Sequence, residues 1–315
     1  METNIASAHH LRARQSPQSL YMSMTTSVDV NQPLPQLIRS LSEHFQKAGF
    51  PSALAEAEWL LAGILQTRRS ELYVERNRVL TVEQQEILKQ YYCRRLQREP
   101  LQYILQSCEF FGIEFKVNSA VLIPRPETEL LVEKVIALAQ TFNAVRIADL
   151  GAGSGCLAVS LAKHLPAAKL LAIDISAEAL KVAEENAQAN GVAQKITFRQ
   201  ADMCASINAI HSDQFDIVVS NPPYILPAER ETLQPEIRDF EPEAALFVEG
   251  DGLKFYRCIL AFCQRHLKPS GWVACEMASQ RSAAIEKLFR ESNFASVEIM
   301  PDYAGLYRHL TAQKS

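Results

Sequence analysis

A short apolar segment runs straight into a glycine-rich turn in the stretch Val145-Arg146-Ile147-Ala148-Asp149-Leu150-Gly151-Ala152-Gly153-Ser154-Gly155. Its first half predicts a buried strand, and a helix is expected to follow from residue 156 to about residue 164. The glycines allow the backbone to approach a ligand closely, with amide groups at the helix N-terminus. Their spacing is G-x-G-x-G and not the G-x-G-x-x-G of dinucleotide sites, so it favours a ligand without a pyrophosphate.

Strands and helices alternate on the C-terminal side of this turn, which is the pattern of a parallel sheet. Helices are expected at 177–189, 253–267 and 281–291. Strands are expected at 169–173, 195–199, 215–220 and 271–275, then two closing strands at 297–300 and 307–311 for which an antiparallel pairing is open. The segment therefore predicts an α/β fold with a mostly parallel sheet.

Carboxylates accompany three of these strand ends, and the carboxyl ends of parallel strands meet at one edge of a sheet. Asp149 precedes the glycine turn, and Asp174 ends the second strand, where a carboxylate commonly takes ribose hydroxyls. Asp202 follows the third strand and could accept hydrogen bonds from an adenine amino group. A glycine turn alone is a weak indication of a cofactor, but together with these carboxylates it predicts an adenosine-containing one.

The fourth expected strand runs into Asn221-Pro222-Pro223-Tyr224. Two consecutive prolines stop the strand and stiffen the chain at its carboxyl end, where open α/β sheets bind ligands. The Asn221 side-chain oxygen and the Pro222 carbonyl can accept both hydrogens of a planar NH2 group, and the Tyr224 ring can cover its face. The other interpretation is an ordinary strand-terminating turn, since Asn-Pro is common in turns.

The N-terminal third of the chain predicts helices without strands, at about 34–48, 52–66, 70–76 and 81–97. A capping-box pattern, Thr81-Val82-Glu83-Gln84, opens the last of them. Residues 31–100 thus predict a separate helical bundle, residues 101–121 a β-hairpin linker and residues 122–315 the domain that carries the sheet. Residues 1–30 are polar and aperiodic, which predicts a disordered leader; a transit segment or a misassigned start site are the alternatives.

Residues 122–129 read Leu-Ile-Pro-Arg-Pro-Glu-Thr-Glu. The prolines keep Arg125 extended, and a helix is expected from residue 126 or 127 to about residue 141. One hypothesis is that Arg125 binds an anionic or carbonyl part of a site. Glu241 and Glu249 are interpreted as solvated or loop-anchoring residues and not as catalytic acids.

The composition describes a globular chain without an excess of basic charge. Its 315 residues hold 32 Lys and Arg against 36 Asp and Glu, so the net charge is −4, which counts against a large nucleic-acid surface. No apolar run is long enough to span a bilayer. The seven cysteines are scattered without a C-x-x-C pair, so we expect reduced core thiols, a reducing compartment and no metal site.

Two of these motifs resemble known sites. Residues 149–155 with Asp174 are similar to the cofactor site of class I S-adenosylmethionine-dependent methyltransferases, and residues 221–224 resemble the N/D-P-P-Y/F motif of those that methylate planar nitrogens. Adenine N6 and protein glutamine N5 methyltransferases share that motif. Three further stretches, 98–104, 122–129 and 241–246 with 250–253, resemble the HemK/PrmC release factor glutamine methyltransferases. Met203 departs from a frequent aromatic of that family, and Ala278 from a usual glycine.

The resemblance implies a Rossmann-like, seven-stranded class I fold with a small N-terminal helical domain for substrate docking. It implies S-adenosylmethionine as cofactor, bound by Gly151, Ala152, Gly153, Ser154, Gly155, Asp174, Asp202, Met203 and Asn221. It implies Asn221, Pro222 and Tyr224 as catalytic residues, and these with Pro223 as substrate-binding residues. The implied substrate is the Gly-Gly-Gln glutamine of peptide chain release factors in translation termination, with no direct contact to nucleic acid or membrane.

The resemblance further implies a cytoplasmic monomer that needs no metal. Two alternatives stay open at this point. One is an adenine-N6 nucleic-acid methyltransferase, and the other is a non-catalytic scaffold that binds S-adenosylmethionine.

Overall fold

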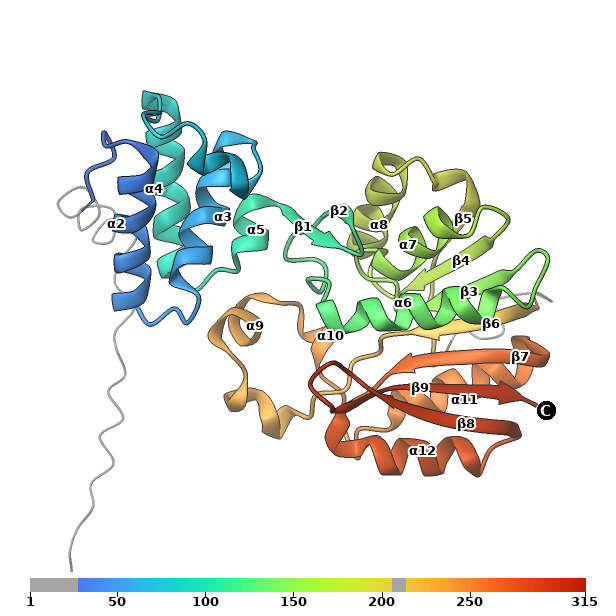
Figure 1. The fold of residues 1–315 in the computed structure, drawn as a ribbon. Coiled ribbons are helices and arrows are strands. Elements are labelled where there is room, and N and C mark those ends of the chain that lie inside the picture. Colours follow the sequence, from blue (N-terminus) through green and yellow to red (C-terminus); the bar gives the residue numbers. More distant parts are fainter. Residues whose placement is uncertain (1–27, 206–213) are drawn as a thin grey trace, which may run out of the picture. The chain divides into compact units, whose positions relative to one another are not determined.

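The computed structural model describes residues 28–205 and 214–315, and the chain divides into two compact units between Leu105 and Gln106 (Figure 1). The predicted leader, residues 1–30, lies almost wholly outside the described residues. Its last residues are described, and Val28 and Val30 are buried in the hydrophobic core of the first unit. The packed part of this unit therefore includes Val28 and Val30, ahead of the boundary expected at residue 31.

The first unit is built from helices around one core. They are α2 (Leu34–Lys47), α3 (Ala53–Leu65), the 3-10 helix η1 (Arg69–Tyr73), α4 (Val82–Leu96) and α5 (Leu101–Leu105). The predicted capping box is confirmed, since the Gln84 N–H donates to Thr81 Oγ1 and the Thr81 N–H donates to Gln84 Oε1. Residues 101–105, which the sequence assigned to the hairpin linker, form α5 instead, because Leu101 and Ile104 lie one helical turn apart and both enter this core.

A two-stranded hairpin opens the second unit. It consists of β1 (Ser107–Phe110) and β2 (Ile113–Lys116), joined by Phe111 and Gly112 with φ of 53° and 68°. Positive φ at both turn residues matches the twist of paired strands. Phe110 and Phe115 are buried in the core of the second unit. The segment expected as a linker, residues 101–121, is thus divided between the two units.

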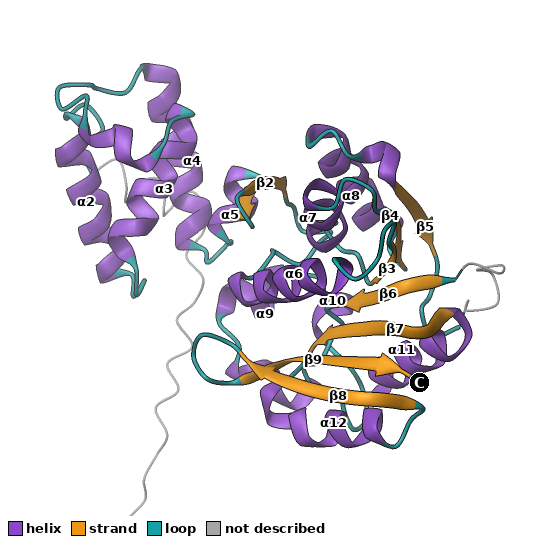
Figure 2. Cartoon of the chain, turned by 45° about the vertical axis from the view of Figure 1, so that its right-hand side comes forward, coloured by secondary structure: helices purple, strands orange, loops and turns teal. Residues whose placement is uncertain are grey.

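The second unit holds a seven-stranded sheet in the order β5-β4-β3-β6-β7-β9-β8 (Figure 2). The strands are β3 (Arg146–Leu150), β4 (Lys169–Asp174), β5 (Ile196–Gln200), β6 (Phe215–Ser220), β7 (Leu267–Glu276), β8 (Phe294–Pro301) and β9 (Tyr307–Lys314). Neighbours from β5 to β7 pair in parallel, whereas β9 pairs antiparallel with both β7 and β8. This confirms the predicted mostly parallel, seven-stranded α/β fold.

Helices cover both faces of the sheet, so its central strands are apolar on both sides. They are α6 (Pro126–Ala139), α7 (Cys156–His164), α8 (Ala177–Ala189), α11 (Lys254–His266) and α12 (Ser282–Arg290). Ile147 and Ile217 pack into one core with residues of α6 and α7. Ala148 and Val218, the next residue on each strand, pack into the other core with residues of α11 and α12. The strand order reverses between β3 and β6, which is where such sheets bind ligands.

The chain between β6 and α11, for which the sequence predicted no helix or strand, is partly helical. It contains the 3-10 helix η4 (Pro227–Thr232) and the short helices α9 (Pro235–Phe240) and α10 (Glu243–Leu246). Hydrogen bonds of Ile225 to Leu246 and Val248 tie the two ends of this segment together next to the sheet edge. Over the described residues, no helix combines the length and apolar character that crossing a membrane requires.

Candidate active site

A cavity of about 510 Å³ opens at the carboxyl edge of the sheet, beside β3 and β6. Most of the site residues expected from the sequence line it: Gly151, Ala152, Gly153, Ser154, Asp174, Asp202, Met203, Asn221 and Pro223. Gly155, Pro222 and Tyr224 do not line it, although Pro222 and Tyr224 stand beside residues that do. The strand order therefore brings the glycine turn and the Asn-Pro-Pro-Tyr motif to one cavity.

The glycine turn is fastened to β4 and shaped by positive φ values. The N–H groups of Gly151 and Ala152 both donate to the Ile173 carbonyl, over 2.8 and 2.9 Å. Gly153 has a φ of 53°, and a Cβ added there would meet nothing within 4 Å. Gly155 has a different reason to be glycine: its added Cβ would lie 2.9 Å from the Ala183 Cβ of α8. Gly155 thus allows α7 to approach α8 and does not face the ligand space.

The buried Asp149 side chain accepts a hydrogen bond from the first turn of α7. Its side chain is fully buried, and Oδ2 accepts a hydrogen bond from the Ala158 N–H over 3.2 Å. Oδ1 has no hydrogen-bond partner within the described part of the chain. Burial raises the pKa of this carboxyl to about 7, and the neighbouring Asp174 charge adds to the rise.

Asp174 and Asp202 shape the backbone around the cavity. Asp174 Oδ2 accepts from the Gly153 N–H over 2.8 Å, and Oδ1 accepts from the Ser176 N–H over 2.9 Å. Asp202 Oδ1 accepts from the Cys204 N–H over 2.7 Å. A carboxylate oxygen can accept more than one hydrogen bond, so both side chains keep capacity for ligand hydroxyl or amino groups.

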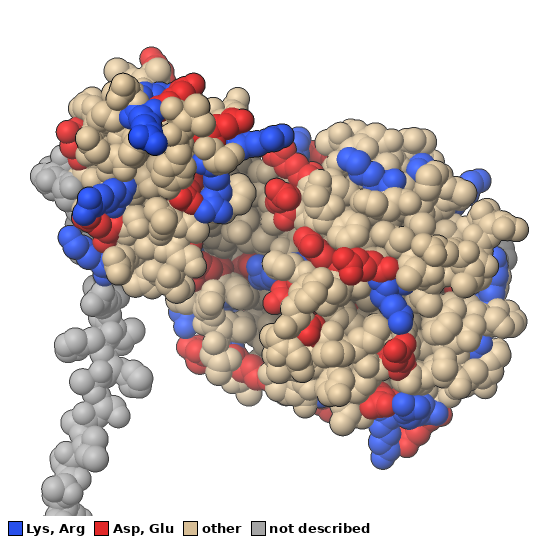
Figure 3. Space-filling model, in the orientation of Figure 1, with Lys and Arg blue, Asp and Glu red and all other residues tan. Residues whose placement is uncertain are grey.

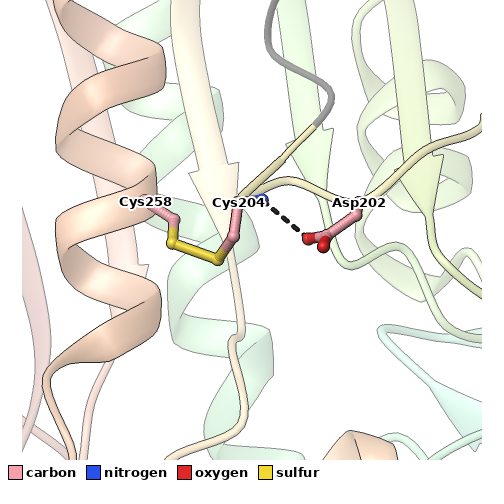
Figure 4. Close-up of a disulfide and its surroundings, with 3 residues drawn as sticks. All are labelled: Asp202, Cys204 and Cys258. Carbon is pink, nitrogen blue, oxygen red and sulfur yellow. Dashed lines mark hydrogen bonds between the residues drawn. A yellow bond between two sulfur atoms is a disulfide. The ribbon is translucent and has the colours of Figure 1, made fainter.

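A disulfide between Cys204 and Cys258 corrects the expectation that all cysteines are reduced (Figure 4). Cys204 lines the cavity next to Asp202, and Cys258 lies on α11. Their Cα atoms are 4.9 Å apart, although the residues are separated by 54 positions in the chain. No local spacing pattern announces such a pair. The remaining cysteines, Cys93, Cys108, Cys156, Cys263 and Cys275, are free.

The Asn-Pro-Pro-Tyr motif is held by a chain of hydrogen bonds that the sequence interpretation missed. The Asn221 Nδ2 donates to Thr128 Oγ1 over 3.2 Å, and the Thr128 hydroxyl donates to Glu276 Oε2 over 2.6 Å. The Tyr224 hydroxyl donates to the other oxygen, Glu276 Oε1, over 3.2 Å. Glu276 directly follows the strand expected at 271–275, and Thr128 lies within the family-like stretch 122–129, but neither was assigned a role.

Burial dominates the protonation equilibria of this network. Desolvation raises the pKa of the Glu276 carboxyl, while the hydroxyls of Thr128 and Tyr224 and the charge of Arg308 oppose the rise. Desolvation, followed by the charge of Glu276, raises the pKa of the Tyr224 phenol. Tyr224 is therefore a neutral hydrogen-bond donor and not a general base at neutral pH.

Comparison with known proteins agrees with this geometry. Residues 36–105 match the family model described as PrmC N-terminal domain, and residues 126–238 match that of the Methyltransferase small domain. A release factor glutamine methyltransferase of Chlorobaculum tepidum is 39% identical over 282 residues, 88% of this chain and 95% of the relative. That of Geobacter sulfurreducens is 38% identical over 265 residues, 84% of this chain and 91% of the relative.

The chain belongs to the release factor glutamine methyltransferase family. A relative from Koribacter versatilis with the same name is 36% identical and covers 89% of this chain and 98% of its own length. Among solved structures, the hMettl16 catalytic domain in complex with the MAT2A 3′UTR hairpin 6 has a TM-score of 0.53 at 18% identity, covering 71% of this chain and 81% of that one. At that identity the likeness concerns the fold alone.

The two departures from the family pattern are accommodated locally. Met203 lines the cavity, with its Cε 3.2 Å from the position that a Cβ on Gly151 would take. Ala278 has φ and ψ of −67° and 122°, which any residue can adopt, so glycine is not required there.

Two arginines fasten the segment after the motif. Arg125 Nη2 donates to Glu241 Oε1 over 2.5 Å, and Glu241 is almost fully buried. The loop-anchoring interpretation of Glu241 is thus confirmed, and Arg125 is its partner. Arg281, which the sequence interpretation missed, donates to the Tyr224 carbonyl over 2.7 Å and to Glu229 Oε2 over 2.8 Å.

Proposed function

We propose that this protein transfers a methyl group from S-adenosylmethionine to the side-chain nitrogen N5 of the glutamine in the Gly-Gly-Gln motif of peptide chain release factors. The observation that carries the proposal is the orientation of Asn221. Its Nδ2 is engaged by Thr128, which leaves Oδ1 as the acceptor at a cavity that also contains the glycine turn.

The cavity residues fit the proposed cofactor. Gly153 presents backbone without a side chain beside open space, and the Asp174 carboxylate next to it keeps acceptor capacity for ribose hydroxyls. Asp202 offers a carboxylate and Met203 an apolar side chain for an adenine ring. S-adenosylmethionine, when bound, supplies an electrophilic methyl group on a positively charged sulfur.

The residues of the motif activate a poor nucleophile by orienting it. An amide nitrogen has its lone pair delocalised into the carbonyl. We infer that Asn221 Oδ1 and the Pro222 carbonyl accept its two hydrogens, which fixes the nitrogen and favours a lone pair directed at the methyl group. Positioning of this kind is worth several orders of magnitude in rate. No strong general base is required, because the product can lose its proton once the nitrogen carries the methyl group.

An adenine-N6 methyltransferase would use the same motif, so the motif does not separate adenine methylation from glutamine methylation. Surface charge and the choice of substrate do. On the face shown in Figure 3, basic and acidic side chains are interspersed on both units. With a net charge of −4, the chain has no excess of basic side chains to neutralise the phosphates of a nucleic acid. We further propose that the first unit docks the release factor and that the enzyme acts as a cytoplasmic monomer.

Methyl transfer can be measured with labelled S-adenosylmethionine and three acceptors. These are a release factor, the same factor with its Gly-Gly-Gln glutamine replaced by alanine, and unmethylated DNA and RNA. We expect label on the intact factor alone. Label on nucleic acid, or on the factor without its glutamine, would contradict the proposal.

Asn221→Ala tests the assigned role of the motif. Loss of the acceptor oxygen should lower kcat by on the order of 100-fold or more, with cofactor affinity changed only a few-fold. Asn293→Ala, which alters an exposed asparagine near the C-terminal strands, is the matched control and should retain full activity. Equal kcat in Asn221→Ala and wild type would refute the role of Asn221.

A further inference from the structure

The side-chain amide of Asn221 has two ends with opposite hydrogen-bonding character. Its oxygen accepts, whereas its NH2 group only donates. A substrate NH2 group needs the Asn221 oxygen as its acceptor. If the Asn221 amide were rotated by a half-turn about its last side-chain bond, its own NH2 group would face the substrate NH2 group, and two donors cannot hydrogen-bond to each other. The proposed chemistry therefore requires something in the protein to select one of two nearly isosteric orientations.

The selecting groups are Thr128, on the first turn of α6, and Glu276, at the end of β7. An ionised carboxylate can only accept hydrogen bonds. The single hydrogen of the Thr128 hydroxyl is therefore committed to Glu276 Oε2, over 2.6 Å. The Thr128 oxygen then faces Asn221 with lone pairs only, so the amide must turn its NH2 group toward it, over 3.2 Å. The acceptor-only character of the carboxylate thus determines, through Thr128, which end of the Asn221 amide faces the substrate.

Burial makes this selection strict. Thr128 and Glu276 are each 1% exposed, so water does not compete for their hydrogen bonds. Around the carboxylate, Tyr224 donates to Oε1, and the Tyr256 hydroxyl of α11 donates to the Glu276 carbonyl over 3.2 Å. Arg308 of β9 and Glu127 of α6 are the charged groups that act on it. Burial raises the pKa of the Glu276 carboxyl, whereas the two hydroxyls and the charge of Arg308 oppose that rise and favour the ionised form on which the selection depends.

Resting on the function proposed above, we propose that Thr128 and Glu276 are positioning residues for methyl transfer. Ionised Glu276 orders the Thr128 hydroxyl, which holds the Asn221 amide with Oδ1 toward the substrate. The same carboxylate holds the Tyr224 hydroxyl, so one group aligns both ends of the Asn-Pro-Pro-Tyr motif. Neither residue needs to touch the reacting atoms.

The test uses near-isosteric variants of the full chain. Thr128→Val removes the hydroxyl, and Glu276→Gln introduces an NH2 group that can donate to Thr128 and release its hydrogen toward Asn221. We expect kcat to fall by on the order of 10- to 100-fold in each, with cofactor affinity unchanged. Tm should be unchanged or raised in Glu276→Gln and lowered in Thr128→Val, which leaves the buried carboxylate one donor short. Thr128→Ser should restore most of kcat. The double variant should be little worse than either single one, because both break the same chain.

Thr311→Val is the matched control. Thr311 is also fully buried in the second unit, and its hydroxyl has no partner within the described residues. The same substitution there should leave kcat unchanged. Wild-type kcat in both site variants, or a loss of kcat in Glu276→Gln that is matched by a loss of Tm or of cofactor binding, would overturn the positioning role.

A readout without substrate separates this inference from the proposed function. The side-chain NH2 signals of Asn221 can be assigned in a 15N NMR spectrum by their loss in Asn221→Ala. They should be protected from solvent exchange in wild type and Thr128→Ser, and exposed in Thr128→Val. If release factor is not methylated, the proposed function fails while this protection pattern still decides the orientation of the amide. Equal protection in Thr128→Val and wild type would refute the inference.

Discussion

Asp149 and Glu276 are buried carboxyl groups at the edge of the sheet where the cavity opens, and each orders a neighbouring element. Asp149 accepts a backbone N–H of α7, and Glu276 accepts two hydroxyls beside the Asn-Pro-Pro-Tyr motif. Burial raises the pKa of both groups, so their charged forms reduce the free energy of unfolding. At Glu276 the charged form fixes the direction of two hydrogen bonds, whereas folded Asp149 keeps its proton up to about pH 7.

The pKa of Asp149 predicts a pH dependence of stability. The folded protein keeps this proton up to about pH 7, whereas the unfolded chain releases it at about pH 4. The unfolding free energy should therefore fall as the pH rises through this window, by roughly 4 kcal/mol from this group. Asp149→Asn removes that component and should be more stable than wild type at about pH 8. Urea denaturation of ligand-free protein across the window measures the effect; parallel profiles for both proteins would contradict it.

At the scale of elements, the glycine turn depends on the contact between α7 and α8. Gly155 has a φ of 78° and lies close to Ala183. A side chain at this position would therefore be disfavoured both by the backbone conformation and by a clash with Ala183. Gly155→Ala should lower the free energy of unfolding by on the order of 1–3 kcal/mol and weaken cofactor binding. Gly191→Ala is the control, since φ is 70° but the added Cβ meets open space. Equal losses measured by denaturation would show that packing against α8 is unimportant.

The disulfide ties the loop after β5 to α11 beside the cavity (Figure 4). Closing a loop of 54 positions stabilises a chain by up to about 4 kcal/mol. Cys258→Ser should therefore have a lower urea midpoint of unfolding than wild type. A reductant should lower the midpoint of wild type but not that of this variant. Disulfides are rare in reducing compartments such as the proposed cytoplasmic location. Counting the free thiols of protein that was alkylated inside intact cells would show whether this bond is formed there. Identical urea midpoints with and without reductant in wild type would contradict the prediction.

On the scale of the whole molecule, each unit contains its own hydrophobic core. We expect calorimetry to resolve two transitions, since separately packed domains need not unfold together. Leu41→Ala, at a fully buried position of α2, should destabilise the first unit by roughly 2–5 kcal/mol and shift only one transition. A single transition that moves as a whole would show that the units unfold cooperatively.

Elements with strong local signals agree closely between sequence and structure. The helix expected at 177–189 is α8, Ala177–Ala189, and the strand expected at 215–220 is β6, Phe215–Ser220. Ser176 caps the first through its side chain, and β6 is a continuous buried apolar run. Segments without such periodicity, above all α9 and α10, were not predicted. Their short helices depend on tertiary contacts rather than on an apolar face of their own.

Local periodicity, glycine and proline were enough to predict the alternation of strands and helices, the glycine turn and the Asn-Pro-Pro-Tyr corner. Which side chains meet across the sheet edge depends instead on how the whole chain packs. Thr128 and Glu276 are 148 positions apart and Cys204 and Cys258 are 54 apart, yet each pair is in direct contact. Such contacts follow from strand order and register, which depend on the packing of the whole sheet and not on any single stretch of sequence.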